Sequence, residues 1–136
     1  LVNMIVDIER IGDYSKNILD LAINYPDALN TKHLHKDLHD VEKAVKERFD
    51  HTVDAVKTQD VKIARNLLKG IKEEVTGASD RIVNNIIAGD LEFESGSEAA
   101  AIALYARYLK RIGSHLKNIT TTIVNPIDSI GYRVKK

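Results

Sequence analysis

The sequence predicts an all-α protein, an antiparallel up-down four-helix bundle that forms a single domain over residues 1–136. Apolar residues recur every three or four positions in four long stretches, which is the spacing of one helix face. Only two prolines occur, Pro26 and Pro126, and each follows the end of such a stretch. No segment alternates apolar and polar residues convincingly, so we expect no sheet. Short connections make successive helices antiparallel.

The first two helices precede Asp60. The first is expected over residues 1–24, with the stripe Met4, Ile8, Ile11, Ser15, Ile18 and Ala22. The second ends near Gln59, with the stripe Leu34, Leu38, Val41, Val45, Phe49, Val53 and Val56. The first pattern begins at Leu1 with no capping Ser, Thr, Asp or Asn before it, so we expect this chain to be a fragment of a longer protein.

The third helix is expected to begin after a cap at Asp60 and to end at Gly89, because aspartate is a common N-cap and glycine a common terminator. Its stripe is Val61, Ala64, Leu68, Ile71, Val75, Ala78, Ile82 and Ile86. Gly70 and Gly77 lie inside it and weaken it. Ser97 is expected to cap the fourth helix, whose stripe is Ile102, Tyr105, Leu109, Ile112, Leu116, Ile119 and Ile123.

Composition excludes several classes of protein. Twenty basic and twenty acidic residues give a formal net charge of zero, which argues against nucleic-acid binding. No cysteine is present, so disulfides, thiolate nucleophiles and Cys-ligated metals are excluded. The longest uncharged stretch, residues 118–127, is too short to span a membrane, which needs about 20 apolar residues. No nucleophile–base pair or glycine-rich phosphate loop is visible, so we expect no enzyme.

An internal repeat joins the first and fourth predicted helices. Residues 10–18 (Arg-Ile-Gly-Asp-Tyr-Ser-Lys-Asn-Ile) align with residues 111–119 (Arg-Ile-Gly-Ser-His-Leu-Lys-Asn-Ile) at an offset of 101, and six of the nine positions are identical. The apolar stripes keep the same register, and each copy is followed by a proline. The two helices therefore descend from one ancestral unit. If that unit has three helices, the other two helices of the first copy lie upstream of Leu1.

The segment Asp7-Ile8-Glu9-Arg10-Ile11-Gly12-Asp13-Tyr14, followed by Asn17-Ile18, resembles the signature of the PhoU family. The tail, residues 124–132, resembles the end of PhoU-like proteins, including domains attached to sodium/phosphate cotransporters. The resemblance implies two three-helix repeats, of which this chain holds the last helix of repeat one and all of repeat two. It also implies cytoplasmic negative regulation of phosphate uptake through protein partners, a phosphate transporter and a sensor kinase. Attachment to or docking on a membrane transporter and a homo-oligomer are both compatible with it.

Some PhoU proteins bind metal clusters through pairs of carboxylates four residues apart, so the resemblance implies a metal site at Glu9 and Asp13. A cation such as Fe, Mn, Mg or Zn would convert the repulsion between two such carboxylates into chelation. The alternative is that Arg10 and Lys16 neutralise both groups on a solvated face. Copy two has Lys110 and Ser114 at the matching positions, so we expect its cluster to be lost.

Three further constellations have less specific patterns. Asp50 and Asp54 also lie four residues apart, but nearby lysines favour a surface ion-pair ladder. His35 and His39 could bind zinc, yet the glutamate of a zinc-protease motif is missing, which favours solvated histidines.

The third is His115, which suggests a histidine phosphotransfer domain. The pattern of such domains has a lysine three residues after the histidine, whereas Lys117 follows His115 by two. The sequence therefore favours a regulatory PhoU-like domain. The alternative is a metal-binding or scaffold bundle without a phosphate role.

Overall fold

The computed structural model of the chain describes residues 2–25, 35–89 and 91–125. These residues form only helices, namely α1 (Val2–Asn24), α2 (His35–Thr58), α3 (Val61–Leu68), the π-helix η1 (Lys72–Thr76), α4 (Gly77–Ala88) and α5 (Gly96–Val124). The prediction of an all-α protein is confirmed. Leu1, Leu34, both prolines, the first connection and the tail from residue 126 onward lie outside the described residues.

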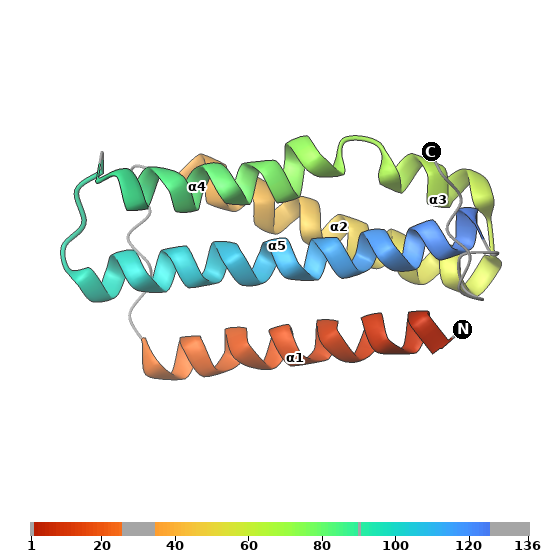
Figure 1. Cartoon of the computed structure of the whole chain (residues 1–136), viewed down its shortest axis with the longest axis horizontal. Coiled ribbons are helices and arrows are strands. Elements are labelled where there is room, and N and C mark those ends of the chain that lie inside the picture. Colours follow the sequence, from red (N-terminus) through yellow and green to blue (C-terminus); the bar gives the residue numbers. More distant parts are fainter. Residues whose placement is uncertain (1, 26–34, 90, 126–136) are drawn as a thin grey trace.

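The helices form a three-helix unit to which α1 is added. Helix α5 lies in the centre and contacts α2, α3, η1 and α4, while the backbone of α1 comes close to that of α5 alone among the described helices. Figure 1 shows that α1 runs along α5 in the opposite direction, on the side away from α3 and α4. Among the described residues, the fourth helix of the expected bundle thus lies against a single neighbour, and a large part of its surface is exposed.

The predicted third helix is interrupted, which corrects the expectation of one continuous helix. Helix α3 ends at Leu68, and Gly70 adopts a left-handed φ of 74° that only glycine tolerates easily. The α2 side chain of Arg48 stabilises this break, since its Nη2 donates to the carbonyl of Lys69 at 3.0 Å and lies 2.6 Å from Oε2 of Glu74. The chain then continues through the π-helix into α4.

The predicted ends of the first two helices are confirmed, since α1 ends at Asn24 and α2 at Thr58. Two of the three predicted capping residues are also confirmed. Asp60 accepts hydrogen bonds from the backbone amides of Lys62 and Ile63, and Gly89 ends α4 with a φ of 76°. The predicted cap at Ser97 is wrong. Ser95 caps α5 instead, because its Oγ accepts from the amide of Glu98 at 3.1 Å.

The core forms around α5. The stripe predicted for α5 is confirmed, with all its members buried except Tyr105, which is half-buried. On α1 the predicted stripe is confirmed in part, since Met4, Ile11 and Ile18 pack against the core. Ile8, Ser15 and Ala22 are exposed, and Asp7 and Tyr14 complete the face toward α5 in their place. The difference reflects the packing of α1, which has one neighbour rather than two among the described helices.

Helix α2 departs from its predicted stripe in its second half. Leu38, Val41 and Val45 are buried as expected, but Phe49 is 44% exposed. The buried positions are instead Arg48, Thr52 and Ala55. No helix among the described residues is long and apolar enough to cross a membrane.

Candidate functional site

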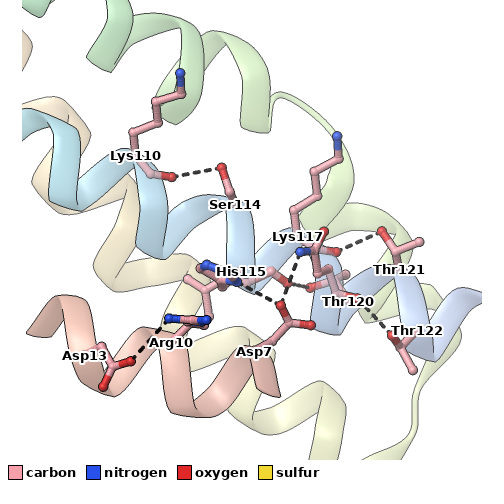
Figure 2. Close-up of polar contacts among 12 residues, drawn as sticks. Asp7, Arg10, Asp13, Lys110, Ser114, His115, Lys117, Thr120, Thr121 and Thr122 are labelled. Atoms are coloured by element: carbon pink, nitrogen blue, oxygen red, sulfur yellow. Dashed lines mark hydrogen bonds and ion pairs between the residues drawn. The ribbon is translucent and has the colours of Figure 1, made fainter. Parts of the chain in front are cut away.

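The interface between α1 and α5 holds a buried carboxylate. Asp7 of α1 is 7% exposed, and its Oδ1 lies 2.8 Å from Nδ1 of His115 and accepts from Nδ2 of Asn118 at 3.2 Å. Figure 2 shows Asp7 pointing across the interface at His115. A buried carboxylate is costly unless it is hydrogen-bonded, so these two partners fix the register of α1 on α5. His115 is therefore a structural partner of Asp7, which argues against a solvated phosphotransfer histidine.

Aromatic contacts continue the same interface. The ring of Tyr14 lies 6.0 Å from that of His115 in a stacked arrangement and 6.2 Å from that of Tyr108. Positions 108 and 115 are the repeat equivalents of positions 7 and 14. The contact of Asp7 with His115 and the contact of Tyr14 with Tyr108 are therefore the same pairing, seen from the two ends of the interface. Helices α1 and α5 are related by a local two-fold axis near Ile11 and Ile112, which both belong to the core.

The signature glycine has different surroundings in its two copies. A Cβ atom added to Gly113 would lie 2.5 Å from Cγ1 of Val75, a fully buried residue of η1. Gly113 thus allows the π-helix to approach α5 closely. At the equivalent Gly12, no atom of the described residues lies within 4 Å of the added Cβ. Within the described part of the chain, the two copies of the glycine therefore differ in what they contact.

A groove of about 670 Å³ runs between α1 and α2, with α5 as its floor. Apolar side chains from all three helices line it, among them Ile11, Phe49 and Leu109, and polar groups stand along its edge. One of these is Tyr105, which donates a hydrogen bond to Glu42. Burial, reinforced by this bond to a carboxylate, raises the pKa of Tyr105 above its ordinary value, so the phenol stays protonated.

A second groove, of about 390 Å³, lies between α2 and the η1–α4 segment, and we call it the acidic groove. Five carboxylates and two cationic side chains line it, namely Asp37, Asp40, Glu47, Glu73, Glu74, Lys43 and Arg81. All seven are on the accessible side of their helices or at its edge. The groove is open, charged and mostly acidic, which suits recognition of a polar partner better than binding of an apolar ligand.

Glu9 and Asp13, the carboxylates predicted to bind metal, lie on the solvent-facing side of α1. Oδ2 of Asp13 is 3.8 Å from Nη1 of Arg10, and both side chains are more than half exposed. This contact is part of the alternative to metal binding, in which Arg10 and Lys16 neutralise the carboxylates of Glu9 and Asp13. Figure 2 shows Arg10 and Asp13 beside each other on α1, joined by this contact.

Comparison with known families gives one match. The model of the PhoU domain matches residues 38–123, which cover almost all of α2, α3, η1 and α4 and the whole of α5 except its last residue. The chain belongs to the PhoU family. No curated protein and no solved structure matched it. The matched range is the three-helix unit that the family resemblance implied as the second repeat. PhoU domains have a role in phosphate-related regulation at the level of the family.

In this PhoU domain, the second copy has replaced the carboxylates of the signature. Lys110 stands at the position equivalent to Glu9, and its Nζ lies 2.7 Å from Oδ1 of Asp80 on α4. Ser114, equivalent to Asp13, donates its hydroxyl hydrogen to the carbonyl of Lys110. A fixed ammonium thus occupies the space beside Asp80 that a bound cation would need. The residues of this copy do not fit a metal.

The first copy offers only part of a metal site. No group of three or more His, Asp or Glu side chains among the described residues is arranged to hold a metal ion. Glu9 and Asp13 alone supply too few oxygens for six-coordinate Mn or Fe. The described part of the chain therefore does not complete the site that the family resemblance implies.

The remaining candidates are not assembled into sites. Asp50 and Asp54 are exposed on α2, and within the described residues no ion pair joins them to the neighbouring lysines, so the predicted ladder is not formed. His39 lies 3.8 Å from Glu42, while the side chain of His35 lies outside the described residues. Sequence reasoning missed the pairing of Lys110 with Asp80, since these residues are thirty positions apart and only the fold brings them together.

Proposed function

We propose that this PhoU domain is a regulatory docking module that lowers phosphate uptake by binding a phosphate transporter or its sensor kinase at the cytoplasmic side of the membrane. The observation that carries the proposal is the PhoU match over the three-helix unit, together with the family signature on α1. Regulation by docking needs a stable surface rather than catalytic groups. The packed core around α5 supports such a surface.

The acidic groove is the surface that suits this role best. Its carboxylates come from α2 and from the η1–α4 segment, two elements that Arg48 ties together through its bonds to Lys69 and Glu74. A preorganised charged groove favours fast, specific association with a segment of opposite charge. We therefore expect the partner to present a basic segment, and we expect its binding to weaken as the salt concentration rises.

The test combines phosphate uptake in cells with binding in vitro. Deleting the gene should raise phosphate uptake in phosphate-rich medium, and the purified chain should bind the transporter's cytoplasmic subunits or the sensor kinase. The double variant Asp40→Lys/Glu47→Lys should weaken binding at least tenfold. The matched control Asp20→Lys/Asp50→Lys changes the net charge equally at exposed positions outside the groove and should leave binding within about twofold.

Two outcomes would reject parts of the proposal. If deletion leaves phosphate uptake unchanged and neither partner binds, the chain is a scaffold without a phosphate role. If the partners bind but both double variants weaken binding equally, the regulatory role stands and the acidic groove is not the docking surface.

A further inference from the structure

The apolar core of the described residues is divided into two clusters. The large cluster surrounds most of α5, and the small cluster lies at the end of the unit where α2 leads into α3. The buried members of the small cluster are Ala55, Ala64, Leu67 and Ile123. Met4 and Val56, which are half-buried, pack against both clusters. Helix α3 contributes to the small cluster alone, so its packing does not depend directly on the large one.

Buried polar side chains lie at the boundary between the two clusters. On α2, Arg48 and Thr52 are buried between the positions of the large and the small cluster, and Thr120 has the same place on α5. Nε of Arg48 and Oγ1 of Thr52 have no hydrogen-bond partner among the described residues. A buried polar group without a partner costs free energy, so this boundary is a weak layer in the packing. The small cluster is therefore coupled only weakly to the large one.

Helix α3 lies between two residues with a left-handed backbone. Gln59 precedes the helix with a φ of 53°, and Gly70 follows it with a φ of 74°. Among the described elements, α3 packs on α2 and α5 and has no contact with η1 or α4. Figure 1 shows α3 at one end of the unit, separated from α4 by the break. A few irregular residues at the ends of an element commonly form the hinges of a moving segment, and we call residues 59–70 the α3 flap.

Arg48 connects the α3 flap to the acidic groove. Its Nη2 donates to the carbonyl of Lys69, directly before the hinge at Gly70, and lies 2.6 Å from Oε2 of Glu74. The Arg48 side chain is 10% exposed, whereas the Glu74 side chain is 56% exposed and lines the acidic groove. Glu74 therefore has a buried guanidinium on one side and the open groove on the other. A cation in the groove competes with Arg48 for this carboxylate.

We propose that the pair of Arg48 and Glu74 holds the α3 flap closed, and that a basic segment docked in the acidic groove opens the flap by pairing with Glu74. The inference rests on the proposed function, which places such a segment in this groove. A ligand that pairs better with Glu74 once Arg48 has released it shifts the population toward the open flap. By linkage, an open flap binds that ligand more tightly.

The rest of the groove keeps its shape while the flap opens. Val75 of η1 and Ile82 of α4 belong to the large cluster and are at most 1% exposed, so the wall that they support stays packed on α5. Opening separates α3 from the small cluster and uncovers its apolar side chains. Docking in a charged groove on one face thereby creates an apolar surface at the end of the unit.

Hydrogen exchange of the backbone amides of α3 tests the pair without a ligand, because exchange reports local opening. Glu74→Gln removes the charge that holds Arg48, so exchange in α3 should become at least threefold faster while exchange in the centre of α5 stays unchanged. Glu73→Gln is the matched control. Glu73 is exposed and lines the same groove, but no ion pair joins it to Arg48 within the described residues. Its exchange in α3 should stay within about twofold of the unmodified chain.

A short peptide of alternating lysine and serine is the probe for the groove. When bound to the unmodified chain, it should speed exchange in α3 at least threefold, and it should add little in Glu74→Gln, where the flap is already released. Arg48→Met should open the flap and should also bind the peptide more tightly. Lys43→Met is its matched control, since it removes one positive charge from the groove lining. Lys43→Met should bind less tightly than Arg48→Met and should leave exchange in α3 unchanged.

The outcomes separate this inference from the proposed function. If the peptide binds but exchange in α3 is unchanged or slower, the docking surface stands and the coupling to the flap is wrong. Equal exchange in Glu74→Gln and Glu73→Gln would likewise overturn the inference, because the pair would then not hold the flap. A peptide that does not bind, or that binds equally well to Asp40→Lys/Glu47→Lys, would reject the acidic groove as the docking surface and the coupling with it.

Discussion

The two signature glycines form a matched pair of positions with opposite surroundings. At Gly113, an added Cβ meets Cγ1 of Val75 at 2.5 Å, and Val75 is completely buried in η1. At Gly12, the added Cβ meets no atom within 4 Å in the described part of the chain. We therefore expect Gly113→Ala to destabilise the fold and Gly12→Ala to stabilise it, although the two residues occupy the same place in the repeat.

The magnitude follows from two competing effects. Alanine inside a helix is favoured over glycine by about 1 kcal/mol, and this gain applies at both positions. Overpacking a buried contact costs about 1–3 kcal/mol, and Val75 yields poorly because a β-branched side chain in a helix has one preferred rotamer. The gain cancels between the two variants, so the difference between their unfolding free energies, about 1–3 kcal/mol, measures the contact with Val75 alone.

The assay is urea unfolding followed by circular dichroism. The protein concentration is kept below about 1 µM, so that self-association does not shift the urea midpoint. The midpoint for Gly12→Ala should lie above that of the unmodified chain, and the midpoint for Gly113→Ala should lie below that of Gly12→Ala. The added variant Gly113→Ala/Val75→Ala should lose the clash. Equal midpoints for the two single variants would show that η1 does not approach α5 as closely as described.

Three further predictions concern the core, the interface and the metal. Ile112→Ala should lower the free energy of unfolding by about 2–5 kcal/mol, as seen in urea melts, because a buried side chain leaves a cavity. Asp7→Ala should cost about 1–3 kcal/mol, and a double-mutant cycle with His115→Ala should give a coupling energy above zero; additivity would contradict the buried pair. Calorimetric titration with Mn should give weak binding that Glu9→Gln/Asp13→Asn abolishes, whereas tight binding to this variant would place the metal elsewhere.

Periodicity predicts a helix face correctly where the helix has neighbours on several sides. Helix α5 contacts five other elements, so its apolar stripe and its buried stripe coincide from Ile102 to Ile123. Among the described helices, α1 packs against α5 alone, and its apolar residues are divided between a buried face and an exposed face that holds Ile5, Ile8, Leu19 and Ile23. Apolar periodicity in the sequence does not distinguish the buried face from the exposed face, which is why the predicted stripe included Ile8.

Buried polar groups explain the other differences. Arg48 replaces Phe49 in the core of α2 because its guanidinium satisfies the carbonyl of Lys69 and pairs with Glu74, partners that only the fold supplies. The glycine at position 70 indicated a weak point in the predicted helix. The Arg48 contacts that stabilise the break there could not be predicted from the sequence. The role of Asp7 was hidden for a related reason, since its partners lie more than a hundred residues away.

The local two-fold axis between α1 and α5 has an evolutionary consequence. If the ancestral unit paired with a second copy in this way, each position of the interface occurred twice around the axis, so one substitution changed two contacts at once. Duplication within one gene separated the two contacts. One end of the interface could then acquire a charged partner for His115, at Asp7, while the other end kept an aromatic pair in Tyr14 and Tyr108. Divergence of this kind distinguishes the two helices of the pair, because the contact at one end is polar and the contact at the other is aromatic.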